Sequence, residues 1–598
     1  MTKPTVTSPT VHAPTAPAAP ADALQAKMQE AVHHLQSGRP ADAERCCRAI
    51  LTQHPKVVEA LNLGGVAAYH AGHLDQAQRY LKKAIKIRPD WADAHANLGQ
   101  VLMGMGKTQP AILAFERALK LAPDHTSARI NLARTLLAAQ HLDEAEAAAR
   151  EAVKRDPSAA EGWNTLGIVL QGRDDVDGSE AALREAIRLA PNHVNAVVNL
   201  VVLLETANRA EQIEAVFDAA AQAGVKTPRL DLVMAKAHGR LKDDAKAEAL
   251  LKPMAALNLS PIILRTVHGE LGWIADRADD PARALEHFKQ CNAYAKELCA
   301  PSIDKNRIGE EVRAMHAILQ GLGNPLDVPP QSPLALAPLE GIPDPVFMIG
   351  FPRSGTTLLD QVLSSHPRVV TIEEQPMSDA LAQRAKKMLK GYPQSLFSMS
   401  DAQRRELAEL YWRRARDFAS WEEGDLVVDK LPLNARLVPL LWAVFPRAKF
   451  ICVLRHPADA CLSCFMHEFA LNDAMANFLD FGDTTAFYEA VMGLWLDARA
   501  ALPLMTHTVR YEDVVDNMEA EARKLIDFLD QDWTDEVLDY RQTARAKGLI
   551  HTPSYHQVVQ PIYSHARYRW TRYAGVLDQD ALQRLAPFAE AFGYGMDA

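Results

Sequence analysis

The sequence predicts two architectures in one chain: an array of paired helices, followed by an α/β domain built on a parallel sheet. Two observations predict this division. The first half has a 34-residue period, and short apolar runs alternate with helical stretches after residue 345. The chain has 598 residues, 48% apolar and 23% charged, which indicates more than one soluble globular domain. We expect a disordered tail over 1–22, the helical array over 23–320, a proline-rich linker over 321–342 and the α/β domain over 343–598.

Composition excludes several classes of protein. A formal net charge of -10 argues against general nucleic-acid binding. The chain has no apolar run long enough to span a membrane and no signal-peptide core, so we expect a cytoplasmic protein without a membrane anchor. The seven cysteines are expected to be reduced thiols. Cys461 and Cys464 form one C-x-x-C, which we interpret as an ordinary pair on a helix and not as a redox or metal site. The sequence leaves the oligomeric state open.

The first half repeats every 34 residues. Prolines recur at this interval, and small residues stand 12 and 24 positions before them. Small residues there let the two helices of a repeat pack closely, and the proline ends the second helix. The pattern resembles the tetratricopeptide repeat, which implies a superhelix of stacked helix pairs whose groove binds proteins. The prolines are Pro55, Pro89, Pro123, Pro157 and Pro191; the small residues are Ala43, Ala77, Ala111, Ala145, Ser179, Ala31, Gly65, Gly99, Ala133 and Gly167.

After Pro191 the period fades, although 271–293 still reads as helical, and Ala284 and Phe288 resemble a further repeat. Asparagines recur on the first helix of several repeats, at Asn62, Asn97, Asn131, Asn164 and Asn199. A ladder of amides would suit an extended peptide backbone, so the groove is a candidate binding site for a protein or peptide. A solvated polar face and packing between repeats are the alternatives.

In the second half, apolar strand candidates cover 346–351, 368–372, 425–429, 449–454 and 507–511, with helices expected at 376–391, 402–420, 433–445 and 457–469. Strands that alternate with helices predict a parallel sheet, and ligands of such sheets bind at the carboxyl ends of the strands.

The stretch 346–357, Val-Phe-Met-Ile-Gly-Phe-Pro-Arg-Ser-Gly-Thr-Thr, predicts a strand, an anion-binding turn and a helix start. Gly350 and Gly355 have the spacing of a phosphate-binding loop, but Thr356 stands where the loop's lysine is expected. Arg353 supplies the nearest positive charge, and Thr356 and Thr357 supply hydroxyl donors. We therefore expect an anion other than the triphosphate of ATP.

Further polar residues follow two other strand candidates. Lys430 follows the run at 425–429, and Arg455 with Ser463 eight positions later follows the run at 449–454, where both side chains would grip a phosphate. Asp429 would also read as the magnesium-binding aspartate of a P-loop kinase, an alternative that the missing lysine disfavours.

The two motifs together resemble the sulfotransferase superfamily, whose donor is 3′-phosphoadenosine-5′-phosphosulfate (PAPS). The protein-tyrosine sulfotransferase branch is the more similar. The resemblance covers about 343–598, and its union with repeats is similar to bacterial repeat-containing sulfotransferases. It implies no metal, with Glu374 as base beside Glu373, Lys430 as catalytic lysine and Arg353 shared between catalysis and the donor. The donor-binding residues that it implies are Arg353, Ser354, Gly355, Thr356, Thr357, Arg455, Ser463, Tyr511, Ser554, Gln557 and Arg569.

One residue departs from the resemblance: His467 stands where that branch has a further arginine at the 3′-phosphate site. His366 is a second candidate for the base, but it precedes a proline at a helix end, and we interpret it as structural. That branch is also luminal, membrane-anchored and disulfide-bonded, signals that this sequence lacks. The predicted function is sulfation of a hydroxyl, such as tyrosine in a protein or peptide that the repeats recruit. The alternatives are a carbohydrate or small-molecule acceptor, or a repeat scaffold with a degenerate nucleotide-binding domain.

Overall fold

The computed structural model describes residues 21–207, 209, 212–321, 336–540 and 567–596. Its contacts divide the chain into two compact units, Met1–Pro253 and Met254–Ala598, each described here by itself. The division falls inside the range predicted as the repeat array, since the helices after residue 260 share a core with the sheet. Most of the predicted tail and of the predicted linker lies outside the described residues.

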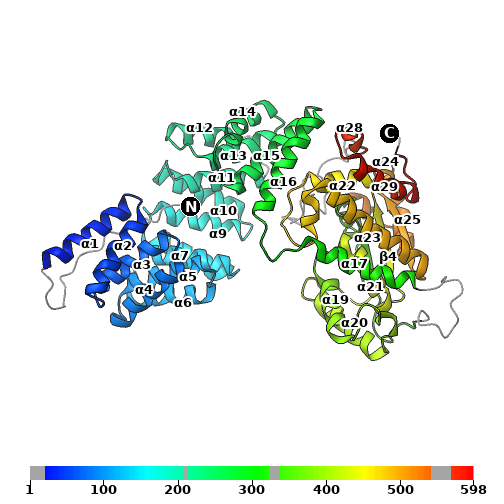
Figure 1. Ribbon diagram of the computed structural model, residues 1–598, viewed down its shortest axis with the longest axis horizontal. Helices are drawn as coiled ribbons and strands as arrows, with labels where there is room; N and C mark the ends of the chain where they lie inside the picture. The colour runs from blue at the N-terminus through cyan, green and yellow to red at the C-terminus, as the bar shows by residue number, and fades with distance from the viewer. Residues whose placement is uncertain (1–20, 208, 210–211, 322–335, 541–566, 597–598) are drawn as a thin grey trace. The chain divides into compact units, whose positions relative to one another are not determined.

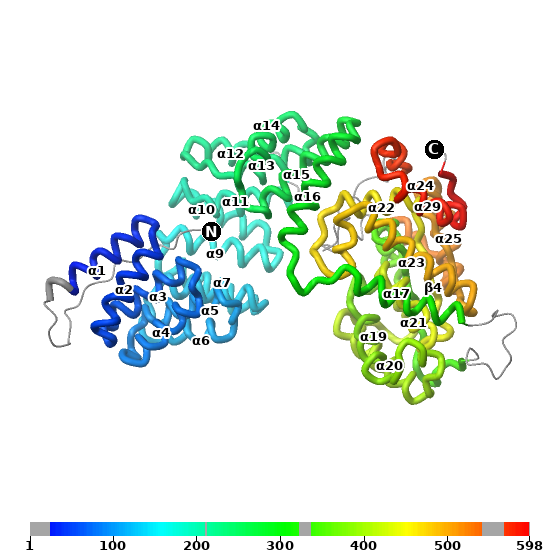
Figure 2. The backbone as a smooth tube through the Cα atoms, in the orientation of Figure 1, coloured from blue at the N-terminus to red at the C-terminus, as the bar shows by residue number. Residues whose placement is uncertain are grey.

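The first unit consists of consecutive helix pairs joined by short turns, which the backbone trace follows from blue to green (Figures 1 and 2). The helices are α1 (Ala21–Gln36), α2 (Pro40–Gln53), α3 (Val58–His70), α4 (Leu74–Ile87), α5 (Ala92–Gly104), α6 (Thr108–Leu121), α7 (Thr126–Ala138), α8 (Leu142–Arg155), α9 (Ala160–Gln171), α10 (Val176–Leu189), α11 (Val194–Thr206), α12 (Ile213–Gln222), α13 (Pro228–Arg240) and α14 (Asp244–Ala255).

The predicted repeats are confirmed. Each periodic proline stands two positions after the last residue of an even-numbered helix, from α2 to α10. The small residues lie where the two helices of a pair touch. A methyl group on Gly65 would lie 2.5 Å from Leu81, and one on Gly99 would lie 2.6 Å from Phe115. A larger residue would therefore push the paired helices apart.

The recurring asparagines bond to one another across repeats. The side-chain amide of Asn97 donates to the side-chain oxygen of Asn62 at 3.0 Å, and Asn199 donates in the same way to Asn164 at 2.9 Å. Asn164 is buried. These four amides therefore support the alternative of packing between repeats, and they weaken the case for a peptide-binding ladder.

The second unit begins with three helices, α15 (Pro261–Arg277), α16 (Pro281–Glu297) and α17 (Lys305–Gln320), which are green in Figure 1. It continues into a sheet of five parallel strands in the order β2-β3-β1-β4-β5. The strands are β1 (Val346–Gly350), β2 (Val369–Glu373), β3 (Leu426–Lys430), β4 (Lys449–Leu454) and β5 (Met505–Arg510), all within two residues of the predicted bounds. The predicted fold class, helical repeats followed by a parallel α/β domain, is confirmed.

The remaining described helices of this unit are α18 (Thr356–Ser364), α19 (Met377–Met388), η3 (Leu396–Ser398), α20 (Asp401–Ala415), η4 (Pro432–Leu437), α21 (Val438–Val444), α22 (Pro457–Phe465), η5 (Met475–Leu479), α23 (Phe481–Ala501), α24 (Tyr511–Asp516), α25 (Met518–Phe528), η6 (Asp535–Asp539), α28 (Trp570–Tyr573) and α29 (Gln579–Ala591). The helix predicted at 433–445 begins as the 3-10 turn η4, while the other three predicted helices are present with shifted ends.

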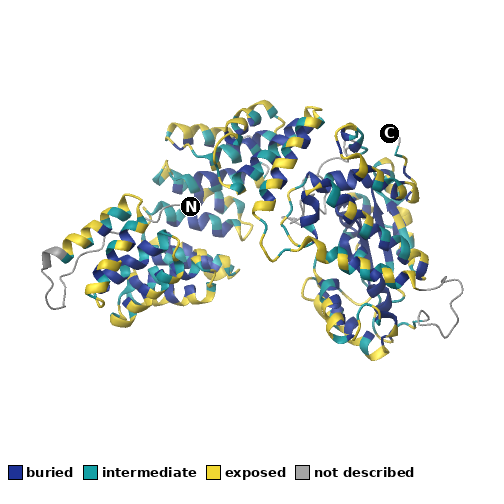
Figure 3. Cartoon of the chain, in the orientation of Figure 1, coloured by how far each residue is buried: buried dark blue, intermediate teal, exposed yellow. Residues whose placement is uncertain are grey.

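The central strands β3, β1 and β4 are almost wholly buried, whereas the edge strands β2 and β5 include intermediate residues and β5 also exposed ones (Figure 3). Alternate residues of β1 separate the two cores. Phe347 and Ile349 pack with α20, α21 and α23, whereas Val346 and Met348 pack with α18 and α25. Helices α15 to α17 contribute buried side chains to the first of these cores, among them Phe288 and Met315. No helix in the described part of the chain is long and apolar enough to cross a membrane.

Candidate functional site

The candidate site lies at the carboxyl ends of the central strands. The parallel register pairs Glu373 of β2 with Lys430 of β3, and Gly350 of β1 with Val453 of β4. Polar residues that follow these strands therefore meet at one edge of the sheet, where ligands of parallel sheets bind.

The loop between β1 and α18 has the backbone geometry of an anion-binding turn. Arg353 has a φ of 68° and Gly355 a φ of 99°, both in the left-handed region. A methyl group on Gly355 would also lie 2.6 Å from the ring of Tyr511, so only glycine fits there. The loop leads into α18, whose first turn carries Thr356 and Thr357, and a helix N-terminus favours an anion.

The two motifs found in the sequence are in direct contact. The Arg353 guanidinium donates to the Ser463 hydroxyl at 3.3 Å, and Arg455 donates to the backbone oxygen of Arg353 at 3.3 Å. The Arg455 guanidinium also lies 5.4 Å from the centre of the Tyr511 ring. The structure thus brings Arg353, Arg455, Ser463 and Tyr511 into one cluster with two positive charges.

Lys430 joins the two neighbouring glutamates. Its ammonium donates to Glu373 at 2.8 Å and to Glu374 at 2.9 Å, and its side chain is fully buried. Burial by itself would lower the pKa of Lys430, but the carboxylates of Glu374, Asp360 and Glu373 outweigh it and raise the pKa. The lysine therefore keeps its charge at neutral pH.

The two glutamates differ in backbone and in exposure. Glu374 has a φ of 50°, a conformation that residues other than glycine rarely adopt. Its backbone N–H donates a hydrogen bond to the backbone oxygen of Lys430 at 2.8 Å, which holds this conformation. Its side chain is 43% exposed, against 26% for Glu373. A strained residue at a strand end that reaches solvent is typical of a residue in a functional site.

Asp429 does not face the site. It alternates with Lys430 on β3, is fully buried, and accepts bonds from Ser378 and Tyr411, each at 3.2 Å. Burial raises its pKa to about 7. The side chain thus lies on the other face of the sheet, and the kinase alternative loses its magnesium ligand.

The two histidines take contrasting positions. His366 bonds through Nε2 to the Asp532 backbone oxygen at 2.9 Å and accepts from the Arg368 amide at 3.1 Å, in line with the structural interpretation. His467 lies close to Arg353, and burial together with that positive charge lowers its pKa to about 3. It is therefore neutral at physiological pH, unlike the arginine that the resemblance implies there.

The predicted C-terminal residues divide into two groups. Ser554 and Gln557 lie outside the described residues. The side chain of Arg569 turns toward α15, where Nε lies 3.9 Å from a carboxylate oxygen of Asp276. Its neighbour Trp570 stacks on His456 with ring centres 5.0 Å apart.

Asp459 is a residue that sequence reasoning missed. It accepts from the Trp570 amide at 2.8 Å and lies 3.6 Å from Arg455, and it is buried. The available signal was its position four residues after Arg455, in the first turn of the helix predicted at 457–469. Cys461 and Cys464 are buried on α22, where burial raises the pKa of both thiols, and no cysteine in the chain is in a disulfide.

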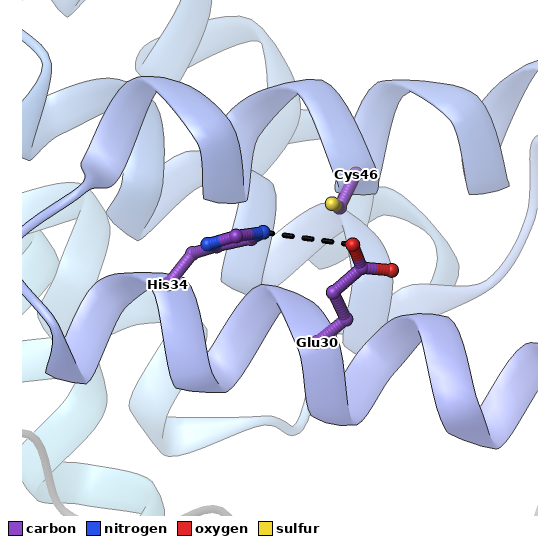
Figure 4. Close-up of side chains that lie close together, drawn as sticks. All are labelled: Glu30, His34 and Cys46. Carbon is purple, nitrogen blue, oxygen red and sulfur yellow. Dashed lines mark ion pairs between the residues drawn. The ribbon is translucent and has the colours of Figure 1, made fainter.

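Two other features lie away from these strand ends. Glu30 and His34 of α1 and Cys46 of α2 bring three potential metal ligands within 4.8 Å of one another, in the first unit (Figure 4). In the second unit a cavity of about 430 Å³ is lined by residues of α17, α19 and η4. Two of its charged lining residues are in ion pairs, Lys386 with Glu311 at 2.5 Å and Arg436 with Asp379 of α19.

The parallel sheet, the anion-binding loop, the arginine cluster and the lysine with its two glutamates define a P-loop-like α/β domain without the P-loop lysine. More particularly, residues 345–535 match the sulfotransferase family, and residues 34–101, 96–160 and 164–225 match tetratricopeptide repeats. The chain therefore carries a sulfotransferase-family domain and tetratricopeptide repeats, as the resemblances predicted. Neither match covers residues 226–344 or 536–598.

Among relatives, an uncharacterized protein of Aquifex aeolicus is 30% identical over 240 residues, which is 38% of this chain and 30% of that protein. Protein-tyrosine sulfotransferase A of Caenorhabditis elegans is 25% identical over 42% of this chain and 68% of its own. Protein-tyrosine sulfotransferase 1 of Danio rerio is 25% identical over 50% of this chain and 84% of its own. The first of these relatives is thus matched over less than a third of its length.

Proposed function

We propose that residues 343–598 transfer the sulfuryl group of PAPS to a hydroxyl acceptor. The observation that carries the proposal is the contact between Arg353 and Ser463, which joins the loop motif to the second cationic motif at one sheet edge. An ATP-binding site needs the loop lysine and a magnesium ligand, and Thr356 and the buried Asp429 supply neither.

The residues of the site fit this donor. Arg353 and the first turn of α18 suit the phosphosulfate end, and Arg455 with Ser463 suits the 3′-phosphate. Tyr511 lies against Gly355 and faces Arg455, and we propose that its ring contacts the nucleotide. Ser354, Thr356 and Thr357 are proposed to line the phosphosulfate, while Ser554, Gln557 and Arg569 remain proposed donor residues.

In the transfer, the bond between sulfur and the 5′-phosphate oxygen breaks, a bond from sulfur to the acceptor oxygen forms, and the acceptor proton passes to a base. We assign the base to Glu374, which is strained and the more exposed of the two carboxylates. Lys430 and Arg353 stabilise negative charge on the transferred group and on the leaving phosphate oxygen. These two cations do the work for which kinases use a metal ion, so the transfer is proposed to need none.

The acceptor is proposed to be tyrosine in a protein or peptide, with carbohydrate and small-molecule hydroxyls as alternatives. The likeness to two proteins named protein-tyrosine sulfotransferase supports tyrosine. Tetratricopeptide repeats generally bind proteins, which supports recruitment of the acceptor by the array.

Binding and transfer are tested on the full chain. Titration calorimetry with 3′-phosphoadenosine-5′-phosphate, the product left by PAPS, is expected to show saturable binding. Arg455→Ala should weaken that binding by about 1.5–3 kcal/mol, because a charge-assisted contact to phosphate is lost. Arg413→Ala on the exposed face of α20 is the control and should bind like the wild type.

Transfer is measured with sulfur-labelled PAPS and a tyrosine peptide, a sugar or a phenol, each with and without EDTA. We expect label in an acceptor and an unchanged rate in EDTA. Failure of the wild type to bind the diphosphate would refute the sulfotransferase proposal. Binding without transfer to any acceptor would favour the scaffold with a degenerate domain, and dependence on magnesium and ATP would favour a kinase.

A further inference from the structure

Helices α15 and α16 are packed as a repeat, although the 34-residue period does not reach them. A methyl group on Gly272 would lie 2.7 Å from the ring of Phe288, sixteen positions later, as Gly99 faces Phe115 in an earlier repeat. These helices nevertheless belong to the compact unit that contains the sheet. They are thus a repeat-type pair that lies in the same compact unit as the sulfotransferase-family domain.

Both α15 and α16 donate hydrogen bonds to the end of α22, the helix that carries Ser463, and to the segment that follows it. The side-chain amide of Asn292 donates to the backbone oxygen of Phe465 at 3.0 Å, and Arg265 donates to that of Phe469 at 3.0 Å. Arg265 also pairs with Glu468 at 3.4 Å. The segment that leaves α22 is therefore held from one side by both helices of the pair.

The buried carboxylate of Asp276, on α15, also binds α28. Asp276 of α15 accepts from Arg572 at 2.7 Å and from the Tyr573 hydroxyl at 2.8 Å, and it is buried. Its backbone oxygen accepts from Arg572 at 3.0 Å. Figure 1 shows α28 near the end of the chain, and α28 contacts both α16 and α22. Two charge-assisted bonds and a hydroxyl bond to one buried acid fix the position of this short helix.

From α28 the contacts continue to the candidate donor site. The Trp570 amide donates to Asp459 at 2.8 Å, and Asp459 lies 3.6 Å from Arg455. Arg455 in turn bonds to the Arg353 backbone and faces Tyr511. The side chain of Asp459 is fully buried, so water cannot replace its carboxylate as the partner of Arg455 and of the Trp570 amide.

We infer that Asp276 is a positioning residue for the donor site, and that α15–α16 forms part of that site's support. Asp276 holds α28, α28 presents the Trp570 amide to Asp459, and Asp459 orients the Arg455 guanidinium toward the donor's 3′-phosphate. The inference rests on the proposed function, because it takes Arg455 as a contact of the 3′-phosphate.

The test compares two nucleotides on the full chain. 3′-Phosphoadenosine-5′-phosphate carries the 3′-phosphate, whereas ADP has adenosine and a 5′-anion without it. Asp276→Asn should weaken binding of 3′-phosphoadenosine-5′-phosphate by about tenfold, because Arg455 would be misplaced. The affinity for ADP should stay within about twofold of the wild type. A loss confined to the 3′-phosphate is a readout that mere loss of structure would not produce.

Asp279→Asn is the matched control. Asp279 accepts from the same Arg572 at 2.9 Å, but it lies on the exposed end of the turn and has 76% of its side chain accessible. Its variant should bind both nucleotides like the wild type. Where Asp276→Asn fails to fold, Tyr573→Phe removes a single hydroxyl from the same carboxylate and should show the same selective loss in smaller measure.

The possible outcomes distinguish failure of the proposed function from failure of the positioning role of Asp276. A wild type that does not bind 3′-phosphoadenosine-5′-phosphate overturns the proposed function. A wild type that binds it, with an Asp276→Asn variant that binds it equally well or loses both nucleotides in parallel, overturns the positioning role alone.

Discussion

The adjacent glutamates at the end of β2 allow a test of the base assignment with an internal control. Both Glu373 and Glu374 accept a bond from the buried Lys430 ammonium, at 2.8 and 2.9 Å. Replacing either by glutamine removes one ion pair of nearly the same length. Both carboxylates are partly exposed, and in each variant the other glutamate still compensates the charge of the buried ammonium. We therefore expect the loss to cost about 0.2–1 kcal/mol, or up to about fivefold in rate.

Replacing the residue that acts as the base should lower the rate of transfer by much more than this. A positioned proton acceptor contributes about 100- to 10,000-fold to the rate, or roughly 3–5 kcal/mol. Glu374→Gln is therefore expected to lower kcat by at least about 100-fold, and Glu373→Gln by no more than about fivefold. Both variants should bind 3′-phosphoadenosine-5′-phosphate like the wild type, because neither carboxylate belongs to the cationic cluster.

The assay is the initial rate of label transfer from PAPS at saturating donor, with donor affinity measured in parallel. Equal losses in the two variants would mean that the glutamates act only through Lys430. A larger loss in Glu373→Gln would move the base to Glu373, and a fully active Glu374→Gln would refute the assignment.

Three further results are expected. Gly355→Ala should weaken binding of 3′-phosphoadenosine-5′-phosphate by at least about tenfold, because the added methyl group would displace Tyr511. The control is Gly341→Ala, where φ is 74° and no atom lies close to the added methyl group; this variant should lose only about 1 kcal/mol of stability. Equal donor binding in the two variants would refute the packing argument. Burial raises the Asp429 pKa to about 7, so wild-type stability should fall as the pH rises from about 4 to 7. The drop in unfolding free energy from pH 5 to 8 should therefore be about 2–3 kcal/mol smaller in Asp429→Asn, and parallel curves in urea titrations would contradict this. A double-mutant cycle of Asn164→Ala and Asn199→Ala should give a coupling energy of about 1 kcal/mol in thermal unfolding of the full chain. Strictly additive effects would show that the hydrogen bond between these two side-chain amides does not stabilise the repeats.

The sequence by itself determined the parts of this protein that depend on local pattern. A helix pair needs small residues at fixed offsets and a proline after its second helix, so the 34-residue period predicted the repeats directly. Parallel strands need short apolar runs, and the five runs predicted all five described strands. Polar residues placed just after such runs must meet at one edge, which is why Arg353, Lys430 and Arg455 were found without coordinates.

Only the tertiary structure decided which side chains face each other. Alternation along β3 separates Asp429 from Lys430, but the choice of face depends on what packs against each side of the sheet. The left-handed backbone of Glu374 is held by a bond to Lys430, 56 positions away. The link from Asp276 to Arg455 runs through α15, α28 and α22, and no local pattern encodes contacts between segments so distant in the chain.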